Sequence, residues 1–275
     1  REARLALEAC VDSRIRVWGP SDPSVAEALT GIGDVFRFEG LLANSGPYYL
    51  RAQRILESHP GKETQLATAI NNHGLALMGL GDMPNAERLF TEALRVLDKA
   101  GLANSPWAVA PLTNLGEIHR GMGLIATAYS EQSRAISLLV TADAESPIRL
   151  IAENNFASVL RDLRRTDEAL RIYANTISRL IKQRGPDDSD VLTMQRNAGR
   201  ALAMDGDHPA AEALIRETLA RLKAAGRTRT LFFAALLGDL GDRQQDQGDI
   251  RGSTESFRAA LQLAEEVSGQ DQPLT

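Results

Sequence analysis

Four asparagines recur at nearly constant spacing along the chain, and their chemistry suits peptide binding. They lie 42, 41 and 42 residues apart: Asn72, Asn114, Asn155 and Asn197. Asparagine is a poor residue for a helix interior, because its side chain competes for backbone hydrogen bonds. A carboxamide both donates and accepts, so a ladder of carboxamides can pair with the backbone of an extended peptide without reading its side chains. We therefore predict that these asparagines contact a peptide.

A structural explanation of the same spacing stays open. The asparagine side chains could bond to each other or to the neighbouring helix, and so stabilise a stack of helices. The equivalent positions at the two ends of the series are not asparagine but Gly31 and Asp239.

Arginines near this ladder indicate the charge of a ligand. They lie one residue before to six residues after an asparagine, offsets that stay broadly on one side of a helix: Arg120, Arg161, Arg196 and Arg200. A guanidinium binds a carboxylate through two parallel hydrogen bonds, so we hypothesise an acidic peptide or an acidic C-terminus as ligand. The alternative is that nearby acids simply pair with these arginines: Glu117, Asp162, Asp239 and Asp242.

The ladder belongs to a repeat whose clearest copy runs from Thr64 to Asp98. This stretch predicts two amphipathic helices joined by a tight turn at residues 81–84. A small residue recurs in its first helix every 41 or 42 residues: Gly33, Gly74, Gly116, Ala157, Gly199 and Gly241. Sixteen positions later stands a mostly large residue: Tyr49, Phe90, Gln132, Tyr173, Ile215 and Phe257. The pattern predicts close helix packing, in which the large side chain fills the space over the small residue.

The same spacing predicts an all-α chain of six helix-turn-helix repeats that follow a half-repeat. The half-repeat covers residues 1–18, and the repeats cover about 24–57, 64–99, 106–140, 148–181, 190–223 and 231–267. No β-branched run alternates with period two, so strands are not expected. The short polar connectors predict one domain over residues 1–275.

The array resembles tetratricopeptide repeats (TPRs), and its long period and Gly-Pro-Xaa-Asp connectors look like the kinesin-light-chain subgroup common in bacterial multidomain proteins. The resemblance implies a right-handed α-α superhelix, a TPR solenoid whose first helices line a concave face and bind an extended peptide or a partner helix. In similar repeats the position of the four asparagines contacts peptide. The Ala- and Arg-rich composition suggests a bacterial source.

Both ends of the sequence suggest a piece of a longer array. Residues 1–18 resemble the back half of a repeat, and residues 268–273 resemble the connectors at 18–23 and 184–189, each of which precedes a new repeat. Neither end has the polar capping face typical of a terminal repeat. We therefore expect further repeats or an attached domain, and uncapped ends that allow self-association.

The composition and the sequence motifs limit the possible functions. A net charge of −5 argues against nucleic acid as the main partner. One cysteine, Cys10, fits a reducing compartment, and no apolar run reaches the roughly 18 residues of a membrane span, so we expect a cytoplasmic protein without a membrane partner. No HExxH, GxSxG, Walker or CxxC motif is present, and the four histidines are scattered. We expect no catalytic activity, no metal and no cofactor.

Two functions therefore stay open. The first is a protein–protein interaction scaffold that docks a partner peptide. The second is a ligand-sensing module that controls an effector domain, such as a kinase, a nucleotide-binding domain or a protease, outside residues 1–275.

Overall fold

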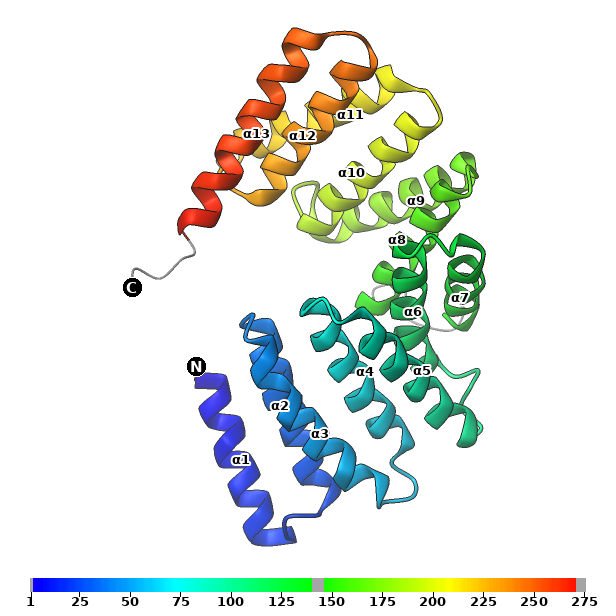
Figure 1. The fold of residues 1–275 in the computed structure, drawn as a ribbon, viewed down its shortest axis with the longest axis vertical. Coiled ribbons are helices and arrows are strands. Elements are labelled where there is room, and N and C mark those ends of the chain that lie inside the picture. The colour runs from blue at the N-terminus through cyan, green and yellow to red at the C-terminus, as the bar shows by residue number, and fades with distance from the viewer. Residues whose placement is uncertain (1, 140–145, 271–275) are drawn as a thin grey trace. The chain divides into compact units, whose positions relative to one another are not determined.

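The computed structural model describes residues 2–139 and 146–270, and helices are the only regular secondary structure of these residues (Figure 1). Thirteen α-helices and one 3-10 helix follow one another in this part of the chain. The chain forms two compact units, residues 1–155 and residues 156–275. We call them unit 1 and unit 2 and describe each by itself. The predicted single-domain organisation stays a prediction.

Unit 1 is a series of antiparallel helix pairs. Its helices are α1 (Glu2–Trp18), α2 (Pro23–Phe38), α3 (Leu42–Glu57), α4 (Glu63–Gly79), α5 (Met83–Lys99), a 3-10 helix (Pro106–Ala108), α6 (Val109–Gly121) and α7 (Ile125–Leu138). Helix α8 (Pro147–Asp162) crosses the boundary between the units. The first helices α2, α4 and α6 alternate with the second helices α3, α5 and α7. Val140, the predicted end of the third repeat, lies outside the described residues.

Unit 2 continues the same alternation. It contains α9 (Thr166–Arg184), α10 (Ser189–Met204), α11 (His208–Ala224), α12 (Leu231–Asp246) and α13 (Ile250–Gln270). Helix α13 runs past the predicted repeat end at residue 267, so the expectation of a connector from residue 268 is wrong for residues 268–270. The connector glycines Gly19 and Gly185 have φ of 88° and 84°, whereas Gly269 stays helical. A single glycine costs a helix only about 1 kcal/mol, so it does not end one alone. Residues 271–273 of that predicted connector lie outside the described residues.

The small and large residues of the repeat meet as predicted. A Cβ atom added at Gly33, Gly74 or Gly241 would lie 2.6–2.8 Å from the ring of Tyr49, Phe90 or Phe257, respectively. The off-type residue Gln132 fills the same space over Gly116, and its Nε2 donates to the carbonyl oxygen of Thr113 (2.9 Å). These contacts fix the distance between the two helices of a repeat.

The turn inside each repeat needs a left-handed residue. Five repeats supply glycine there, with φ between 76° and 91°: Gly40, Gly81, Gly123, Gly206 and Gly248. The fourth repeat places Arg164 at this position with φ of 60°, and no other non-glycine residue of the described chain has a positive φ. A residue with a Cβ atom pays a steric cost in this conformation.

Replacing Arg164 with glycine should therefore stabilise the protein. We expect the free energy of unfolding to rise by up to about 1 kcal/mol, because the steric cost disappears. The hydrogen bond from the Arg164 guanidinium to the Met204 carbonyl is exposed and offsets little of this gain. Urea denaturation measures the change, and Gly206→Ala at the equivalent turn should shift stability in the opposite direction. A lower stability for Arg164→Gly would contradict the assignment of strain to this turn.

Candidate functional site

The asparagines of the predicted ladder join neighbouring first helices in unit 1. The Nδ2 atom of Asn114 (α6) donates to Oδ1 of Asn71 (α4) at 2.9 Å, and Asn71 in turn donates to Oδ1 of Asn72 (3.2 Å). Asn72 donates to Oδ1 of Asp34 (α2) at 3.0 Å, and Asp34 also accepts from the hydroxyl of Tyr49 (2.7 Å). We call these five residues the unit 1 polar network. The network gives Asn72 and Asn114 hydrogen bonds to neighbouring helices, as expected if the asparagine spacing serves to stabilise the stack of helices.

The ladder side chains keep unused hydrogen-bonding capacity. Asn72 and Asn114 are half-buried, whereas Asn71 between them is buried. A carboxamide offers two N–H donors and two acceptor lone pairs. In the unit 1 polar network Asn72 uses one donor and one acceptor site, and Asn114 uses one donor. The network therefore orients both amides while leaving groups that a ligand backbone can meet.

A largely apolar cavity of about 650 Å³ lies in unit 1 and is large enough to receive a side chain. Its apolar wall consists of Leu42, Leu75, Met78, Met83, Ile118 and Met122, and Arg37 and Glu117 stand at its polar edge. Leu75 lies three residues after Asn72, and Ile118 lies four residues after Asn114. Residues at such spacing share one side of a helix, so the cavity lies on the same side of α4 and α6 as the ladder. We call this surface the first-helix face of unit 1.

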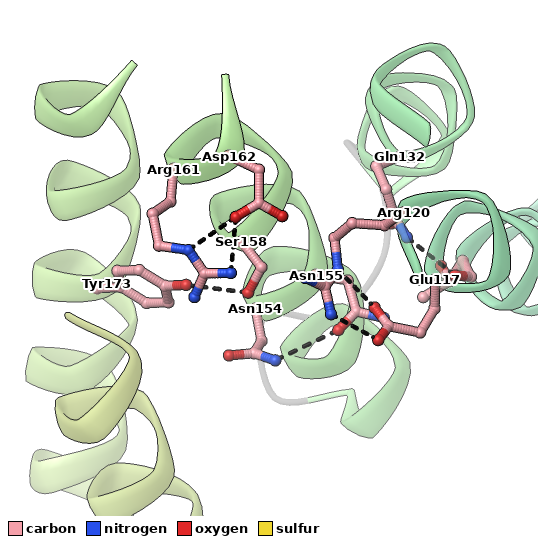
Figure 2. A network of polar contacts seen from close by, with 10 residues as sticks. Glu117, Arg120, Gln132, Asn154, Asn155, Ser158, Arg161, Asp162 and Tyr173 are labelled. Carbon is pink, nitrogen blue, oxygen red and sulfur yellow. Dashed lines mark hydrogen bonds and ion pairs between the residues drawn. The ribbon is translucent and has the colours of Figure 1, made fainter. Parts of the chain in front are cut away.

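Figure 2 shows polar side chains of α6, α7, α8 and α9. In unit 1, Asn154 donates to the Oδ1 atom of Asn155 (3.3 Å), and Arg120 donates to Glu117 through two nitrogens at 2.7 and 3.1 Å. In unit 2, the buried hydroxyls of Ser158 and Tyr173 lie 3.1 Å apart.

The arginines predicted to bind a ligand in unit 2 mostly hold acids of the same chain. Arg161 is buried and donates to the Oδ1 atom of Asp162 at 2.8 and 3.0 Å. Arg196 of α10 forms an ion pair with Asp239 of α12. Together with Arg120 and Glu117, these are the pairings that the sequence left open. Arg200 is exposed and has no hydrogen bond or ion pair among the described residues.

A lateral contact of one kind recurs in both units. In unit 1 the residue directly before a ladder position, Asn71, bonds to the ladder residue of the next repeat, Asn114. In unit 2 the equivalent residue, Arg196, pairs with Asp239 at the ladder position of the sixth repeat. Asn197, the ladder residue beside Arg196, is half-buried. The ladder positions thus form part of the contact between successive repeats.

A second cavity, of about 390 Å³, lies within unit 2. Its walls carry charges of both signs. The positive charges come from Arg161, Arg200 and Arg243, and the negative charges come from four aspartates: Asp162, Asp239, Asp242 and Asp246. Burial, together with the charges of Asp239 and Asp246, raises the pKa of Asp242 against the opposing influence of Arg243 and Arg200. The cavity is therefore polar, in contrast to the apolar cavity of unit 1.

Three histidines occupy hydrogen-bonded positions: His59, His73 and His119. The Nδ1 atom of His119 lies 2.8 Å from Glu131, and its Nε2 atom lies 3.4 Å from Glu87. Burial acts to lower the pKa of His119 and is the largest single influence, but the two carboxylates together outweigh it and raise the pKa above its usual value. Within residues 2–139 and 146–270, no three His, Cys, Asp or Glu side chains gather as a metal site would require.

The raised pKa of His119 predicts a pH-dependent stability. Between the unfolded value of about 6.5 and the raised folded value, the folded protein binds more protons than the unfolded chain. The stability from this group is thus complete below pH 6.5 and is lost as the pH rises through the folded pKa. Urea denaturation at pH 6 and pH 9 should show this loss in the parent and a smaller loss in His119→Gln. Burial lowers the pKa of His73, and this affects stability only below about pH 6.5 and equally in the parent and in His119→Gln. Equal pH dependence of the two proteins would contradict the assignment.

The repeats can now be compared with known families. Models of the tetratricopeptide repeat match residues 65–138, 149–224 and 233–274. The first two segments alone cover more than half of the 275 residues. The chain belongs to the tetratricopeptide repeat family. The predicted family and the all-α TPR solenoid fold are confirmed, and membership of the family supports a role as a protein-interaction scaffold.

Solved TPR structures share the fold at low sequence identity. Putative kinesin light chain repeats of Podospora anserina are 16% identical, with a TM-score of 0.62, and the match covers 74% of this chain and 98% of theirs. BtubC (BKLC) of P. vanneervenii is 18% identical, with a TM-score of 0.68 and coverage of 82% and 91%. The apo form of RapI is 14% identical, with a TM-score of 0.71 and coverage of 96% and 91%. The search of curated proteins finds no significant match.

Several predictions lie beyond these comparisons. No helix among the described residues of this TPR protein combines the length and apolarity that crossing a bilayer requires. The cytoplasmic location, the bacterial source and the control of an effector domain stay predictions.

Proposed function

We propose that this TPR protein is an interaction scaffold that docks an extended peptide of a partner protein on the first-helix face of unit 1. The observation that carries the proposal is the apolar cavity beside the unit 1 polar network. A peptide needs backbone hydrogen bonds for its main chain and an apolar pocket for an anchoring side chain. Asn72 and Asn114 offer the hydrogen bonds to the main chain, and the cavity offers the apolar pocket.

The methionines of the cavity suit a peptide of loose sequence preference. Met78, Met83 and Met122 contribute to the wall, and Met83 and Met122 are 41% and 60% exposed. Methionine is flexible and polarizable, so a methionine-lined surface adapts to apolar side chains of different shape. We expect the bound peptide to insert one large apolar residue, such as Leu, Met or Phe.

The proposal also includes the other predicted ligand-binding residues, which are Asn155 and Arg120 in unit 1 and Asn197, Arg161, Arg196 and Arg200 in unit 2. Three of these arginines already pair with acids, so an acidic ligand depends first on Arg200. An acidic peptide should bind more weakly as salt rises, because exposed charges are screened. Binding that is unchanged by salt would remove the acidic-ligand part of the proposal.

A peptide-array screen tests the docking site. The parent chain, Met122→Glu and Leu50→Glu are applied to the same array, and circular dichroism confirms that all three are folded. Leu50 is 42% exposed on α3 and does not line the cavity, so its variant controls for adding a charge to an exposed apolar position. We expect peptides with a large apolar residue to bind the parent and the Leu50 variant and to be lost by Met122→Glu, because the bound side chain would bury an unpaired carboxylate. Equal binding by all three proteins would place the peptide elsewhere.

A further inference from the structure

The fourth repeat differs from its neighbours at the first turn of α9. Helices α5, α11 and α13 are each preceded by an aspartate whose carboxylate accepts a hydrogen bond from a first-turn amide: Asp82, Asp207 and Asp249. Helix α9 has Arg165 at this position, and an arginine side chain offers no acceptor. The amides of Glu168 and Ala169 donate to the carbonyl oxygen of Arg165. Within the described residues, the amides of Thr166 and Asp167 are left without an acceptor.

Thr166 adds a buried hydroxyl without a partner at the same turn. The residue is 3% exposed, and its Oγ1 atom makes no hydrogen bond in the part of the chain that the structure describes. Buried hydroxyls are normally hydrogen-bonded, and an unpaired one is costly. Thr166 lines a cavity of about 220 Å³ in unit 2. The hydroxyl and the two unused amides therefore give this cavity three groups that can donate to a ligand.

Two arginines bring positive charge to the cavity. The guanidinium of Arg164 donates to the carbonyl oxygen of Met204, and the Nε atom of Arg171 donates to the carbonyl oxygen of Asp167 (3.2 Å). Because these partners are main-chain oxygens without a full charge, they do not neutralise either guanidinium. Arg164 and Arg171 are exposed, and each keeps N–H groups that a ligand can meet.

Three carboxylates line the same cavity and oppose an anion. Glu168 accepts two hydrogen bonds from Arg165, at 2.7 and 2.8 Å, so the charges of this pair cancel. Asp167 and Asp205 are exposed, and water and salt screen their repulsion. Two arginines and two aspartates then balance, and the positive end of the α9 helix dipole tips the site toward an anion.

We propose that this cavity binds a phosphate group, either as the free ion or on a phosphorylated peptide, independently of peptide docking on unit 1. The oxygens of a tetrahedral phosphate can accept at once from the α9 amides, from the Thr166 hydroxyl and from the two guanidiniums. A carboxylate has only two oxygens in one plane and would leave some of these donors unmet. The site also gives a reason for Arg164 in a left-handed turn, because glycine would remove one of the guanidiniums.

Amide NMR of the ¹⁵N-labelled chain tests the site. Sodium phosphate, titrated at constant ionic strength, should shift the signals of Thr166 and Asp167 to saturation, with a Kd of about 5 mM or tighter. Arg171→Gln should weaken binding at least about threefold, because a charged donor is lost. Arg258→Gln, the matched change at an exposed position of α13 that does not line the cavity, should leave binding unchanged. Asp205→Asn should tighten binding about twofold, because it removes a repelling charge.

Two further variants separate a binding role from a structural one. Thr166→Val should weaken phosphate binding at least about threefold, yet its urea midpoint should not fall, because the hydroxyl has no partner to lose. Arg164→Gly should also weaken binding while it stabilises the fold. A shift that does not saturate, or an affinity that Arg171→Gln and Thr166→Val leave intact, would overturn the proposal.

A phosphopeptide distinguishes the two sources of the phosphate group. The probe is an acetylated alanine pentapeptide with a central phosphoserine, and its unphosphorylated form is the control. Tighter binding of the phosphopeptide than of inorganic phosphate would assign the site to a phosphorylated chain. Exclusion of the phosphopeptide, with inorganic phosphate still bound, would assign the site to the free ion.

Discussion

Replacing Phe90 with alanine should lower the free energy of unfolding by about 3–5 kcal/mol. The ring of Phe90 is fully buried and fills the space over Gly74, where an added Cβ atom would lie 2.7 Å from the ring. Its removal leaves a cavity between the two helices of the most regular repeat, and the backbones cannot close it without losing their other contacts. Urea denaturation measures the loss. Phe38→Ala, at a position that is 78% exposed, should cost less than about 1 kcal/mol.

The glycine side of the same contact supplies a second comparison. Gly74→Ala should destabilise by about 1–3 kcal/mol through overpacking against Phe90. Gly199 occupies the equivalent position in unit 2, but the atom nearest to an added Cβ there, on Ile215, is 3.7 Å away. Gly199→Ala should therefore be neutral or stabilising by up to about 1 kcal/mol, because alanine favours a helix over glycine. Equal destabilisation by the two substitutions would contradict the packing rule.

Replacing Asp34 with alanine should cost about 2 kcal/mol by breaking the unit 1 polar network. The carboxylate accepts from Asn72 and from the hydroxyl of Tyr49, a residue that is fully buried. Burial and the hydrogen bond to Asp34 raise the pKa of Tyr49, so the hydroxyl stays protonated and donates. Without Asp34 that buried hydroxyl loses its acceptor, and a buried donor without a partner is costly.

A double-mutant cycle with Tyr49→Phe isolates this contact. The two substitutions together should cost about 1 kcal/mol less than the sum of the single changes, because each already removes the shared hydrogen bond. Asp34→Asn keeps an acceptor oxygen and should lose less than half as much stability as Asp34→Ala. Strictly additive effects would mean that the hydrogen bond contributes nothing to folding.

The repeat packing was predictable because one small and one large residue, sixteen positions apart, decide it within a single helix pair. Gly74 and Phe90 illustrate this: their contact depends on one turn and on no distant part of the chain. Arg164 stands in register with the turn glycines of the other repeats, although arginine itself gives no sign of a left-handed conformation.

The polar contacts between repeats were less predictable, because the residues that make them are not of the same type in every repeat. Asn72 was visible as part of a periodic series, but its partner Asp34 has Leu75 and Glu117 at the equivalent positions of the next two repeats. Asn71 recurs as Asn154 in the fourth repeat but is replaced by Thr113 in the third and by Arg196 in the fifth. A contact between different repeats depends on how the helices stack, and the only sequence signal was the complementary pairing of Arg196 with Asp239. The apolar cavity had no periodic signal at all, since its methionines come from three different repeat positions.

The most direct test of peptide docking on the first-helix face of unit 1 is a calorimetric titration of the tightest array peptide into the parent, Asn114→Ala and Leu50→Ala. We predict that Asn114→Ala weakens binding about tenfold, equivalent to about 1.4 kcal/mol, because one backbone hydrogen bond of the peptide is lost. Leu50→Ala should bind as the parent does, and thermal unfolding shows that each variant is folded at the titration temperature. Parent-like affinity for Asn114→Ala would contradict the account, because the asparagine ladder would then serve only to join the repeats.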